Sequence, residues 1–397
     1  MASDSRAPEI RLLDGRWYQR EPLAEYRWMR DEAPLYYDAS SGLWAATRYA
    51  DVMAISKDAE TFSSAAGSRP DSNSPSMINM DDPQHKRRRR LVNRGFTPKQ
   101  LARQEREVRK ICRELVDRVA ARGECEFVRE IAAPLPMIVI GDMLGVRPED
   151  RDTLLRWSDD LLRPLGSDDP ADALAAAEAA RGWYAYAADV IADRRRKPPQ
   201  DDLISILVHA QIGGEKLDDE QLFHESLLIL IGGDETTRHV ITGGMQALLR
   251  HPDERRKLQQ DPGRIPGAVE EMLRWVSPIK NMNRTLTRDV ALHGERLAAG
   301  DKLLLLYHAA NRDERAFRDP DRFDVSRSPN DHVAFGGYGT HHCLGASLAR
   351  LELRLVFEEI LRRLPDIELA SDAPLRLRRN NFIVGIEEMP VRFSPAR

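Results

Sequence analysis

The stretch from Asp218 to His251 has the pattern of one long helix, long enough to cross the whole molecule. Asp218 and Gln221, three residues apart, form a capping box, which marks the start of a helix. The apolar run that follows keeps a helical pattern as far as His251, a length of roughly 50 Å at about 1.5 Å per residue. Gly232-Gly233 interrupts this run at a cost of about 1 kcal/mol per glycine relative to Ala. We therefore expect another group to lie against the helix backbone at Gly232 and Gly233.

Acids and hydroxyls follow these glycines inside the apolar helix. Glu235 and Thr236 are the two that matter most, because they offer a carboxylate and a hydroxyl to the interior. One explanation is a tolerated kink, in which Thr236 hydrogen-bonds back to the preceding turn. The other is a notch at which oxygen binds. Adjacent side chains cannot both face one ligand, so in the second case Glu235 acts through water or by a swing of its side chain.

The segment HVAFGGYGTHHCLGASLARLEL contains Cys343 among four glycines, followed by leucines at helical spacing. The cysteine therefore lies where a loop enters a helix, and there free N–H groups and the helix dipole stabilise a thiolate. A small buried cysteine before an ordinary helix is the alternative, but it does not account for the glycines. Glycines let a large flat ligand approach the backbone. We predict that Cys343 presents a thiolate to the iron of a haem.

This segment resembles the haem-binding loop of the cytochrome P-450 family, which has His or Arg two residues before the cysteine and Gly two after it. His341, Cys343 and Gly345 match that pattern. The family's aromatic residue usually lies seven residues before the cysteine, whereas Phe335 lies eight before Cys343. The resemblance implies that Cys343 is the axial ligand of the haem iron and that Phe335 contacts the cofactor.

The run GGDETT also resembles the oxygen-binding motif of this family, a small residue and Gly followed by an acid and two threonines. The resemblance implies that Gly232 and Gly233 lie against the haem. It also implies that Thr236 holds the oxygen at the iron through its hydroxyl and that Glu235 supplies protons. Both roles need a positioned hydrogen-bonding group beside the distal face of the iron.

Several charged residues fit the same family. Glu271 and Arg274, three apart on one helix face, match its E-x-x-R pair, and Arg322 in the segment DPDRF is the expected third member. A haem carries two propionates, and buried carboxylates need cations. The resemblance implies that the propionates are held by His85, Arg89, Arg284 and His341.

The rest of the chain predicts a mainly α protein with small β regions, which is similar to the cytochrome P-450 fold. The first 80 residues suggest a helix that ends at Pro34 and then a hairpin over 35–48, and 83–278 is dominantly helical. Short strands and loops are expected over 283–325, and strands again from about residue 367. No repeat or long linker interrupts the pattern. We expect a single domain over 1–397, with residues 1–10 disordered.

Composition argues against several other classes of protein. A net charge of −4 gives no support for nucleic-acid binding, and the basic run Lys86–Arg90 lies in a helical pattern, typical of a solvated face. Three cysteines without a C-x-x-C pair indicate neither a zinc site nor a disulfide framework, as in a reducing cytosol. The N-terminal residues carry no apolar span. We expect a cytoplasmic protein of the soluble bacterial type, without a membrane anchor.

The resemblance is strongest to bacterial cytochromes P-450 that oxidise the side chain of cholesterol and cholest-4-en-3-one. It rests on stretches such as INMDDPQH, LLILIGGDETTRH, EEMLRWVSPIKNM and NFIVG. It implies a haem b monooxygenase that inserts one oxygen atom from O2 into a terminal methyl group, carbon 26 or 27, of a sterol. The residues expected to contact the sterol are Met77, Ile78, Ile279, Asn281, Met282, Phe382, Ile383 and Val384.

No flavin, nicotinamide or iron–sulfur motif is found in the chain, so its two electrons must come from NAD(P)H through a separate ferredoxin and ferredoxin reductase. Arg88, Arg350 and Arg354 are expected to receive this acidic partner. Two other functions stay open. One is hydroxylation of a different lipid, such as a fatty acid, terpene or macrolide. The other is a haem-binding sensor or a peroxide-using haem protein, against which the pair Glu235-Thr236 argues.

Overall fold

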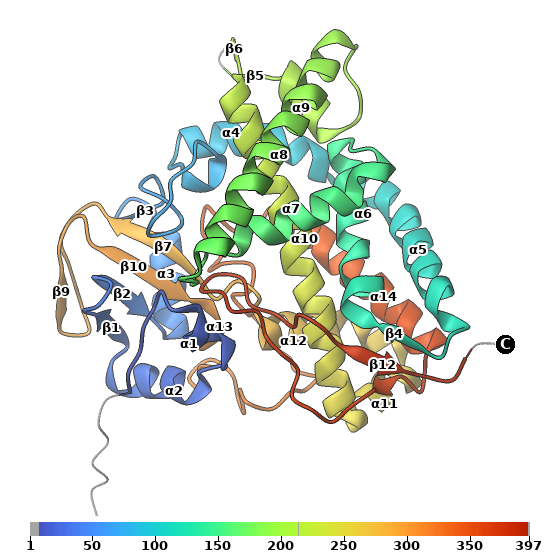
Figure 1. Cartoon of the computed structure of the whole chain (residues 1–397). Helices are drawn as coiled ribbons and strands as arrows, with labels where there is room; N and C mark the ends of the chain where they lie inside the picture. The colour runs from blue at the N-terminus through green and yellow to red at the C-terminus, as the bar shows by residue number, and fades with distance from the viewer. Residues whose placement is uncertain (1–7, 213, 396–397) are drawn as a thin grey trace, which may run out of the picture.

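The computed structural model describes residues 8–212 and 214–395. Helices make up 54% of the structure and strands 11%, which confirms the predicted mainly α fold with small β regions. Figure 1 shows most of the helices gathered on one side of the molecule and the largest sheet on the other. The expected disorder of residues 1–10 falls mostly outside the described residues. At the end of that stretch, Ile10 is packed in the core with 3% of its surface exposed.

The long helices pack around a central one, α10, which contacts helices before and after it in the chain (Figure 1). None of the described helices is both long and apolar enough to span a membrane. The bounds of the long helices are α5 (Pro98–Ala120), α6 (Pro134–Leu144), α7 (Arg151–Leu162), α8 (Pro170–Arg196), α10 (Asp219–Arg250), α12 (Ile265–Val276) and α14 (Ala346–Arg363).

Shorter helices and turns connect these elements and the sheet. The α-helices are α1 (Gly15–Gln19), α2 (Leu23–Glu32), α3 (Tyr49–Lys57), α4 (Gln84–Val92), α9 (Leu203–His209), α11 (Pro252–Gln260) and α13 (Tyr307–Ala310). The tighter turns are η1 (Met77–Asn79), η2 (Asn93–Phe96), η4 (Pro148–Asp150) and η5 (Pro262–Arg264), and η3 (Val128–Ala132) is a π-helical turn.

The largest sheet has the order β1-β2-β10-β7-β3. The predicted hairpin forms its edge, as antiparallel β1 (Leu35–Asp38) and β2 (Leu43–Ala46), and β2 pairs in parallel with β10 (Lys302–Leu306). β7 (Asn281–Leu286) and β3 (Phe62–Ser63) complete it. The short remaining strands are β4 (Glu124–Glu126), β5 (Gln211–Ile212), β6 (Glu215–Lys216), β8 (Val290–Leu292), β9 (Glu295–Leu297), β11 (Glu368–Leu369) and β12 (Pro390–Arg392).

Helix α10 has the length and the capping box that the sequence predicts. The Asp218 side chain accepts a hydrogen bond from the N–H of Gln221, and Gln221 bonds back to the N–H of Asp218. The two central glycines serve different purposes. A Cβ on Gly233 would lie 2.6 Å from Ile140, so Gly233 lets α6 pack closely against α10. At Gly232 no heavy atom of the described chain lies within 4 Å of such a Cβ, so Gly232 borders open space.

The E-x-x-R pair is a buried junction between α12 and the segment after α13. Glu271 and Arg274 have no exposed side-chain surface and form a two-bond ion pair, with both N···O distances 2.8 Å. The prediction that Arg322 is the third member of this junction is wrong. Its side chain is exposed and only its carbonyl oxygen accepts from Arg274, while Arg327 binds Glu271 at 3.0 Å. Both arginines lie in one irregular segment, where sequence alone does not reveal which side chain turns inward.

Candidate active site

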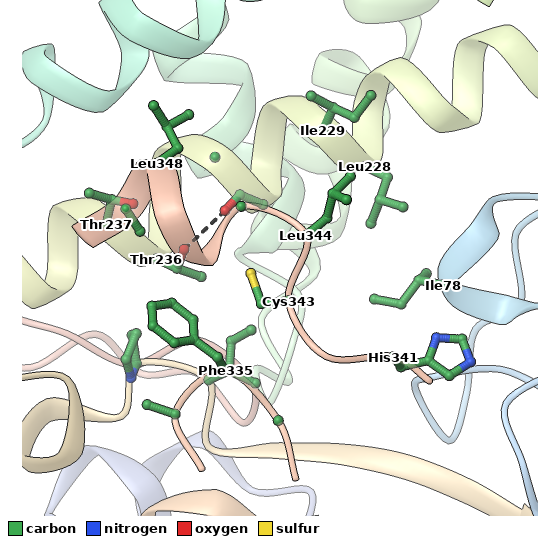
Figure 2. A pocket seen from close by; sticks show the side chains of 18 of the residues that line it. Ile78, Leu228, Ile229, Thr236, Thr237, Phe335, His341, Cys343, Leu344 and Leu348 are labelled. Carbon is green, nitrogen blue, oxygen red and sulfur yellow. Dashed lines mark hydrogen bonds between the residues drawn. The ribbon is translucent and has the colours of Figure 1, made fainter. Parts of the chain in front are cut away.

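A deep, mainly apolar cavity lies between α10, α14 and the loop that precedes α14 (Figure 2). Residues of η1, α4 and β7 complete its wall. Segments far apart in the sequence therefore meet around one space. The predicted cofactor, oxygen and substrate residues that line it are Met77, Ile78, His85, Arg89, Gly232, Gly233, Thr236, Ile279, Met282, Arg284, Phe335, His341 and Cys343.

Cys343 lies just before the N-terminus of α14, and its side chain is accessible from the cavity. Its N–H donates to the carbonyl of Phe335 at 2.9 Å, which closes the glycine-rich loop on itself. Figure 2 shows the sulfur of Cys343 directed into the cavity, where Thr236 and Phe335 also lie. The loop and the start of α14 thus place one thiol opposite α10.

Opposing effects act on the pKa of the Cys343 thiol. Removal from bulk water raises the pKa of the Cys343 thiol, while the N–H groups of Gly345 and Ala346 and the charges of Arg89 and Arg350 oppose this rise. The net direction is upward, so the helix terminus alone does not keep the sulfur ionised. A coordinated metal cation deprotonates a thiol outright. The site therefore suits a metal-bound thiolate better than a free reactive cysteine.

Thr236 faces the cavity from α10, directly beside the open space at Gly232. Its hydroxyl donates to the carbonyl oxygen of Gly232 at 2.9 Å, the bond drawn as a dashed line in Figure 2. The bond back to the preceding turn and the position beside the cavity therefore occur together. A notch with an open glycine and a hydroxyl is available to a small ligand on this side of the cavity.

Glu235 lies outside the cavity lining, and its side chain is fully buried on another side of α10. Arg238 contacts its carboxylate at 2.5 Å and Arg378, from the C-terminal segment, at 2.9 Å. Both arginines also bind Asp159 of α7. Burial favours the neutral acid, but the charges of Arg238 and Arg378 outweigh it and hold the pKa of Glu235 well below its ordinary value. Glu235 is therefore an ionised carboxylate in a closed ion cluster.

Four basic side chains gather at one end of the cavity, at the positions predicted to hold propionates. The rings of His85 and His341 lie 4.1 Å apart, and Arg89 and Arg284 line the same wall. Among the described residues, His85 Nδ1 and His341 Nε2 are buried without a hydrogen-bond partner. Burial, together with the charges of Arg284, His85 and Arg89, lowers the pKa of His341 to about 3. His341 is therefore neutral beside the two arginines, and an anion that binds among these side chains favours its charged form.

The residues around the cavity match the parts of a haem. The cavity offers a thiol on one wall, an open glycine on the opposite wall and a basic cradle with orphaned nitrogens at one end. An iron atom, a flat ring and two carboxylates are the matching parts of the cofactor. The residues present therefore fit a haem with Cys343 as ligand.

Four of the residues predicted to contact the sterol lie outside the lining. In β7, side chains alternate between faces, so Met282 and Arg284 face the cavity whereas Asn281 bonds to Tyr18 and to Arg69 on the other face. The structure corrects the assignment of Asn281 for this reason. It also moves the C-terminal segment out of the lining. Phe382 lies under the guanidinium of Arg69, and Ile383 and Val384 are core residues, each 2% exposed.

The predicted basic surface is only partly present. Arg88 is buried and paired with Glu225 of α10 at 3.0 Å, so its assignment to partner binding is wrong. Arg88 lies three residues after His85 on α4, and both side chains therefore lie on the inward face of that helix. Arg350 and Arg354 lie on the outer face of α14, partly exposed, with acidic neighbours.

The sequence interpretation missed two groups of residues. Leu228 and Ile229 line the cavity one turn before Gly232, and helical periodicity from that glycine predicts both positions. Arg378, which holds Glu235, carries no such signal, because it comes from an irregular segment 143 residues further along the chain.

Comparison with known proteins identifies the family. The sequence profile named Cytochrome P450 matches residues 52–386. This chain belongs to the cytochrome P450 family. It is therefore an oxygenase with a haem-thiolate cofactor, which uses O2 and electrons from a partner.

Curated relatives match along nearly the whole chain. The Steroid C26-monooxygenase of Mycobacterium tuberculosis (strain ATCC 25618 / H37Rv) is 52% identical over 396 residues, which cover 99% of each chain. The Methyl-branched lipid omega-hydroxylase of Mycobacterium bovis is 42% identical over 381 residues, 92% of this chain and 87% of that protein. Near full-length sequence similarity is thus shared with enzymes that carry different names.

Solved structures share the fold. The crystal structure of CYP109E1 from Bacillus megaterium in complex with testosterone superposes with a TM-score of 0.88 at 32% identity. The match covers 95% of this chain and 98% of that one. PksS, a cytochrome P450 of Bacillus subtilis, gives 0.87 at 34% identity, with 97% and 100% of the two chains covered. Both confirm the P450 fold.

Proposed function

We propose that this cytochrome P450 hydroxylates the terminal methyl group, carbon 26 or 27, of a sterol side chain such as that of cholesterol or cholest-4-en-3-one. The observation that carries the proposal is the full-length identity of 52% to a protein named Steroid C26-monooxygenase. The apolar cavity supports it from the structure. Its apolar wall includes Met77, Ile78, Leu228, Ile229, Val240, Ile279 and Met282.

We infer that the cofactor is haem b, because the chain has no C-x-x-C-H motif to attach a c-type haem covalently. Cys343 would hold the iron, and His85, Arg89, Arg284 and His341 would hold the two propionates by charge-assisted hydrogen bonds. Two carboxylates among these cations raise the pKa of His341 and favour its charged form. When bound, the haem supplies the activation of O2 for insertion of one oxygen atom into a C–H bond.

Thr236 and Glu235 are the residues that supply protons. Thr236 holds a hydroxyl proton at Oγ1 on the cavity side of α10, 2.9 Å from the Gly232 carbonyl. When its carboxylate leaves Arg238 and Arg378, Glu235 takes up a proton from solvent water and passes it to Thr236, by a side-chain swing or through water. Proton delivery of this kind needs a positioned acid within reach of the acceptor.

Hydroxylation at the terminal methyl requires that the cavity position this group at the reacting centre, because another C–H bond of the side chain is intrinsically more reactive. The tertiary C–H bond near the end of a sterol side chain is weaker than the C–H bonds of the terminal methyl. Positioning contributes up to about 7–11 kcal/mol in well-oriented reactions, which exceeds that difference in reactivity. A narrow apolar channel that ends beside Gly232, with the sterol rings nearer the entrance, holds the methyl group closest to the reacting centre.

The two electrons come from NAD(P)H through a ferredoxin and its reductase in this proposal. Arg350 and Arg354, partly exposed on the cysteine side of the molecule, offer positive charge to an acidic ferredoxin. Three free thiols, Cys112, Cys125 and Cys343, support a location in the reducing cytoplasm.

The experiment is a reconstitution of the haem-loaded enzyme with ferredoxin, reductase, NADH and cholest-4-en-3-one. We expect the terminal alcohol, followed by the aldehyde and acid in longer incubations, identified by mass spectrometry against standards. A tertiary or ring alcohol as main product contradicts the proposal. So does a difference-spectral titration in which fatty acids bind and sterols do not.

A methyl-branched lipid is the second candidate substrate. It is favoured by the 42% identity to a protein named Methyl-branched lipid omega-hydroxylase. Both candidates present a branched apolar chain end. The same reconstitution with a methyl-branched fatty acid, compared by kcat/KM with the sterol, decides between them.

A further inference from the structure

One carboxylate outside the cavity joins three parts of its wall. Glu225 lies on α10, seven residues before Gly232, and its side chain has no exposed surface. Its Oε1 accepts two hydrogen bonds, from the N–H of Met77 at 2.8 Å and from Nη1 of Arg88 at 3.0 Å. A single oxygen atom thus connects α10, η1 and α4.

Each of the three connected segments carries residues of the cavity. Met77 and Ile78 of η1 line the wall, and so do Leu228 and Ile229, which lie one turn after Glu225 on α10. On α4, Arg88 is followed directly by Arg89 of the basic cradle. The position of the Glu225 carboxylate therefore fixes how far η1 lies from α10, and with it the width of the cavity between Ile78 and Leu228.

The segment that contains η1 is held both by the sheet and by α10. At its start, Arg69 bonds to Asn281 and Asn381, and the N–H of Asn283 donates to the carbonyl of Ser68 at 2.9 Å. The residues over 71–73 between the two anchors are exposed. At the other end, the bond between Met77 and Glu225 joins the turn to the central helix. The last residue of η1, Asn79, keeps a separate bond, because its Oδ1 accepts from the N–H of Ser68 at 2.7 Å. Loss of the Met77–Glu225 bond therefore frees the start of η1, which lines the cavity, while the sheet anchor stays in place.

Stability alone does not explain the buried ion pair of Glu225 and Arg88. Burial raises the pKa of Glu225 to about 7, although Arg88 and the Met77 N–H both favour the charged form. Among the described residues, Glu225 Oε2 and Arg88 Nε are buried without a hydrogen-bond partner. Apolar residues of similar volume often replace such a buried pair with equal or greater stability. What an apolar pair cannot supply is a directional acceptor for one particular backbone N–H.

We propose that Glu225 is a positioning residue for substrate selection, which holds η1 against α10 through the Met77 N–H and so keeps the cavity narrow enough for a slender chain end. The inference rests on the proposed sterol side-chain hydroxylation. Glu225 does not touch the substrate. It acts through Met77 and Ile78, whose side chains form the wall.

The test compares three variants of the haem-loaded enzyme. Glu225→Leu removes the acceptor, whereas Glu225→Gln keeps an amide oxygen for Met77 and loses only the charge. Glu254→Gln is the matched control, because Glu254 also accepts a backbone N–H, from Val325 at 3.1 Å, and binds a cation, Lys257, at 2.8 Å, but lies outside the cavity lining. The readouts are hydrogen exchange of the Met77 amide, the Kd for cholest-4-en-3-one and the product distribution.

We expect Glu225→Leu to speed exchange of the Met77 amide about tenfold or more and to weaken sterol binding by about the same factor, as for loss of a hydrogen bond to a charged group. Hydroxylation then spreads from the terminal methyl to other carbons. Glu225→Gln should recover most of the exchange protection and the terminal selectivity. Glu254→Gln should change neither, whatever it does to the melting temperature.

Two results overturn the inference. One is a Glu225→Leu enzyme that keeps wild-type Met77 exchange and product distribution and differs only in melting temperature. The other is a Glu225→Gln enzyme as unselective as Glu225→Leu, which assigns the effect to the charge instead of the acceptor. Failure of the proposed function gives a different result, because in that case the wild-type enzyme itself does not bind sterol. The exchange of the Met77 amide and the affinity for the lipid that does bind still test Glu225 in that case.

Discussion

Thr236 donates its hydroxyl proton to the carbonyl oxygen of Gly232, four residues earlier on α10, at 2.9 Å. Thr236 lines the cavity, and among the glycines of α10 Gly232 is the one with open space beside it. A ligand that enters this space lies beside the Thr236 hydroxyl, which already donates a hydrogen bond to the Gly232 carbonyl. The hydroxyl must either rotate toward the ligand or accept a hydrogen bond from it, so its contribution is to proton handling and not to substrate affinity.

Thr236→Ala is expected to uncouple turnover without weakening sterol binding. Substrate affinity should stay within about threefold of wild type, since binding of the apolar chain does not use this hydroxyl. Reducing equivalents should be lost as hydrogen peroxide, measured as product formed per NADH consumed. Thr242→Ala is the control, because Thr242 makes the same bond, to the Arg238 carbonyl at 2.9 Å, outside the lining. Unchanged coupling in Thr236→Ala means that the hydroxyl only satisfies the local backbone.

Cys343→Ala should abolish the thiolate-type absorption band of the reduced carbon monoxide complex. The reason is that Cys343 is the cysteine that lines the cavity, while the other two are buried elsewhere in the core. Burial raises the pKa of the Cys112 thiol well above its ordinary range and that of Cys125 to about 12. Cys112→Ala and Cys125→Ala should therefore keep the band. A Cys343→Ala protein that retains it assigns the ligand to one of the other cysteines and contradicts the interpretation of the loop.

Glu235→Gln should slow turnover about 100-fold, the range of general acid–base catalysis, with sterol affinity unchanged. The carboxylate is ionised in its cluster with Arg238 and Arg378, so it is ready to take up and pass on a proton once released. The measurement is kcat with its solvent isotope effect, which should rise in the variant. Asp159→Asn perturbs the same arginines without removing the carboxylate and serves as control. Normal turnover in Glu235→Gln leaves Glu235 only the task of balancing the arginine charges.

Arg327→Leu should lower the free energy of unfolding by about 3–5 kcal/mol, because it leaves part of the charge on a fully buried Glu271 unpaired. Arg322→Ala should change it by no more than about 0.5 kcal/mol, since the exposed Arg322 side chain is not used and its carbonyl remains. Denaturant unfolding followed by circular dichroism measures both. Equal losses in the two variants contradict the assignment of Arg327 as the third member of the Glu271–Arg274 junction.

Features that depend on residues close in the chain can be predicted from the sequence alone. The capping box at Asp218, the length of α10 and the hairpin of β1 and β2 follow from spacing over a few positions. The glycine-rich loop around Cys343 likewise closes on itself, by a bond from Cys343 to Phe335. Short-range patterns of this kind are preserved in the fold, because the hydrogen bonds that create them join residues close in the chain.

Packing of the whole chain sets which distant segments meet. It also sets which way a side chain turns where no helical or strand period constrains it. Arg327 and not Arg322 enters the core, and Arg378 reaches Glu235 from an irregular segment near the C-terminus. Asn281 and Met282 are adjacent in the sequence, yet strand alternation sends one into a polar network and the other into the cavity. Arg88, one of five consecutive basic residues, is buried because Glu225 lies opposite on α10. The physical reason is common to all four: a buried charge or amide is stable only beside its partner, and the partner is brought there by packing.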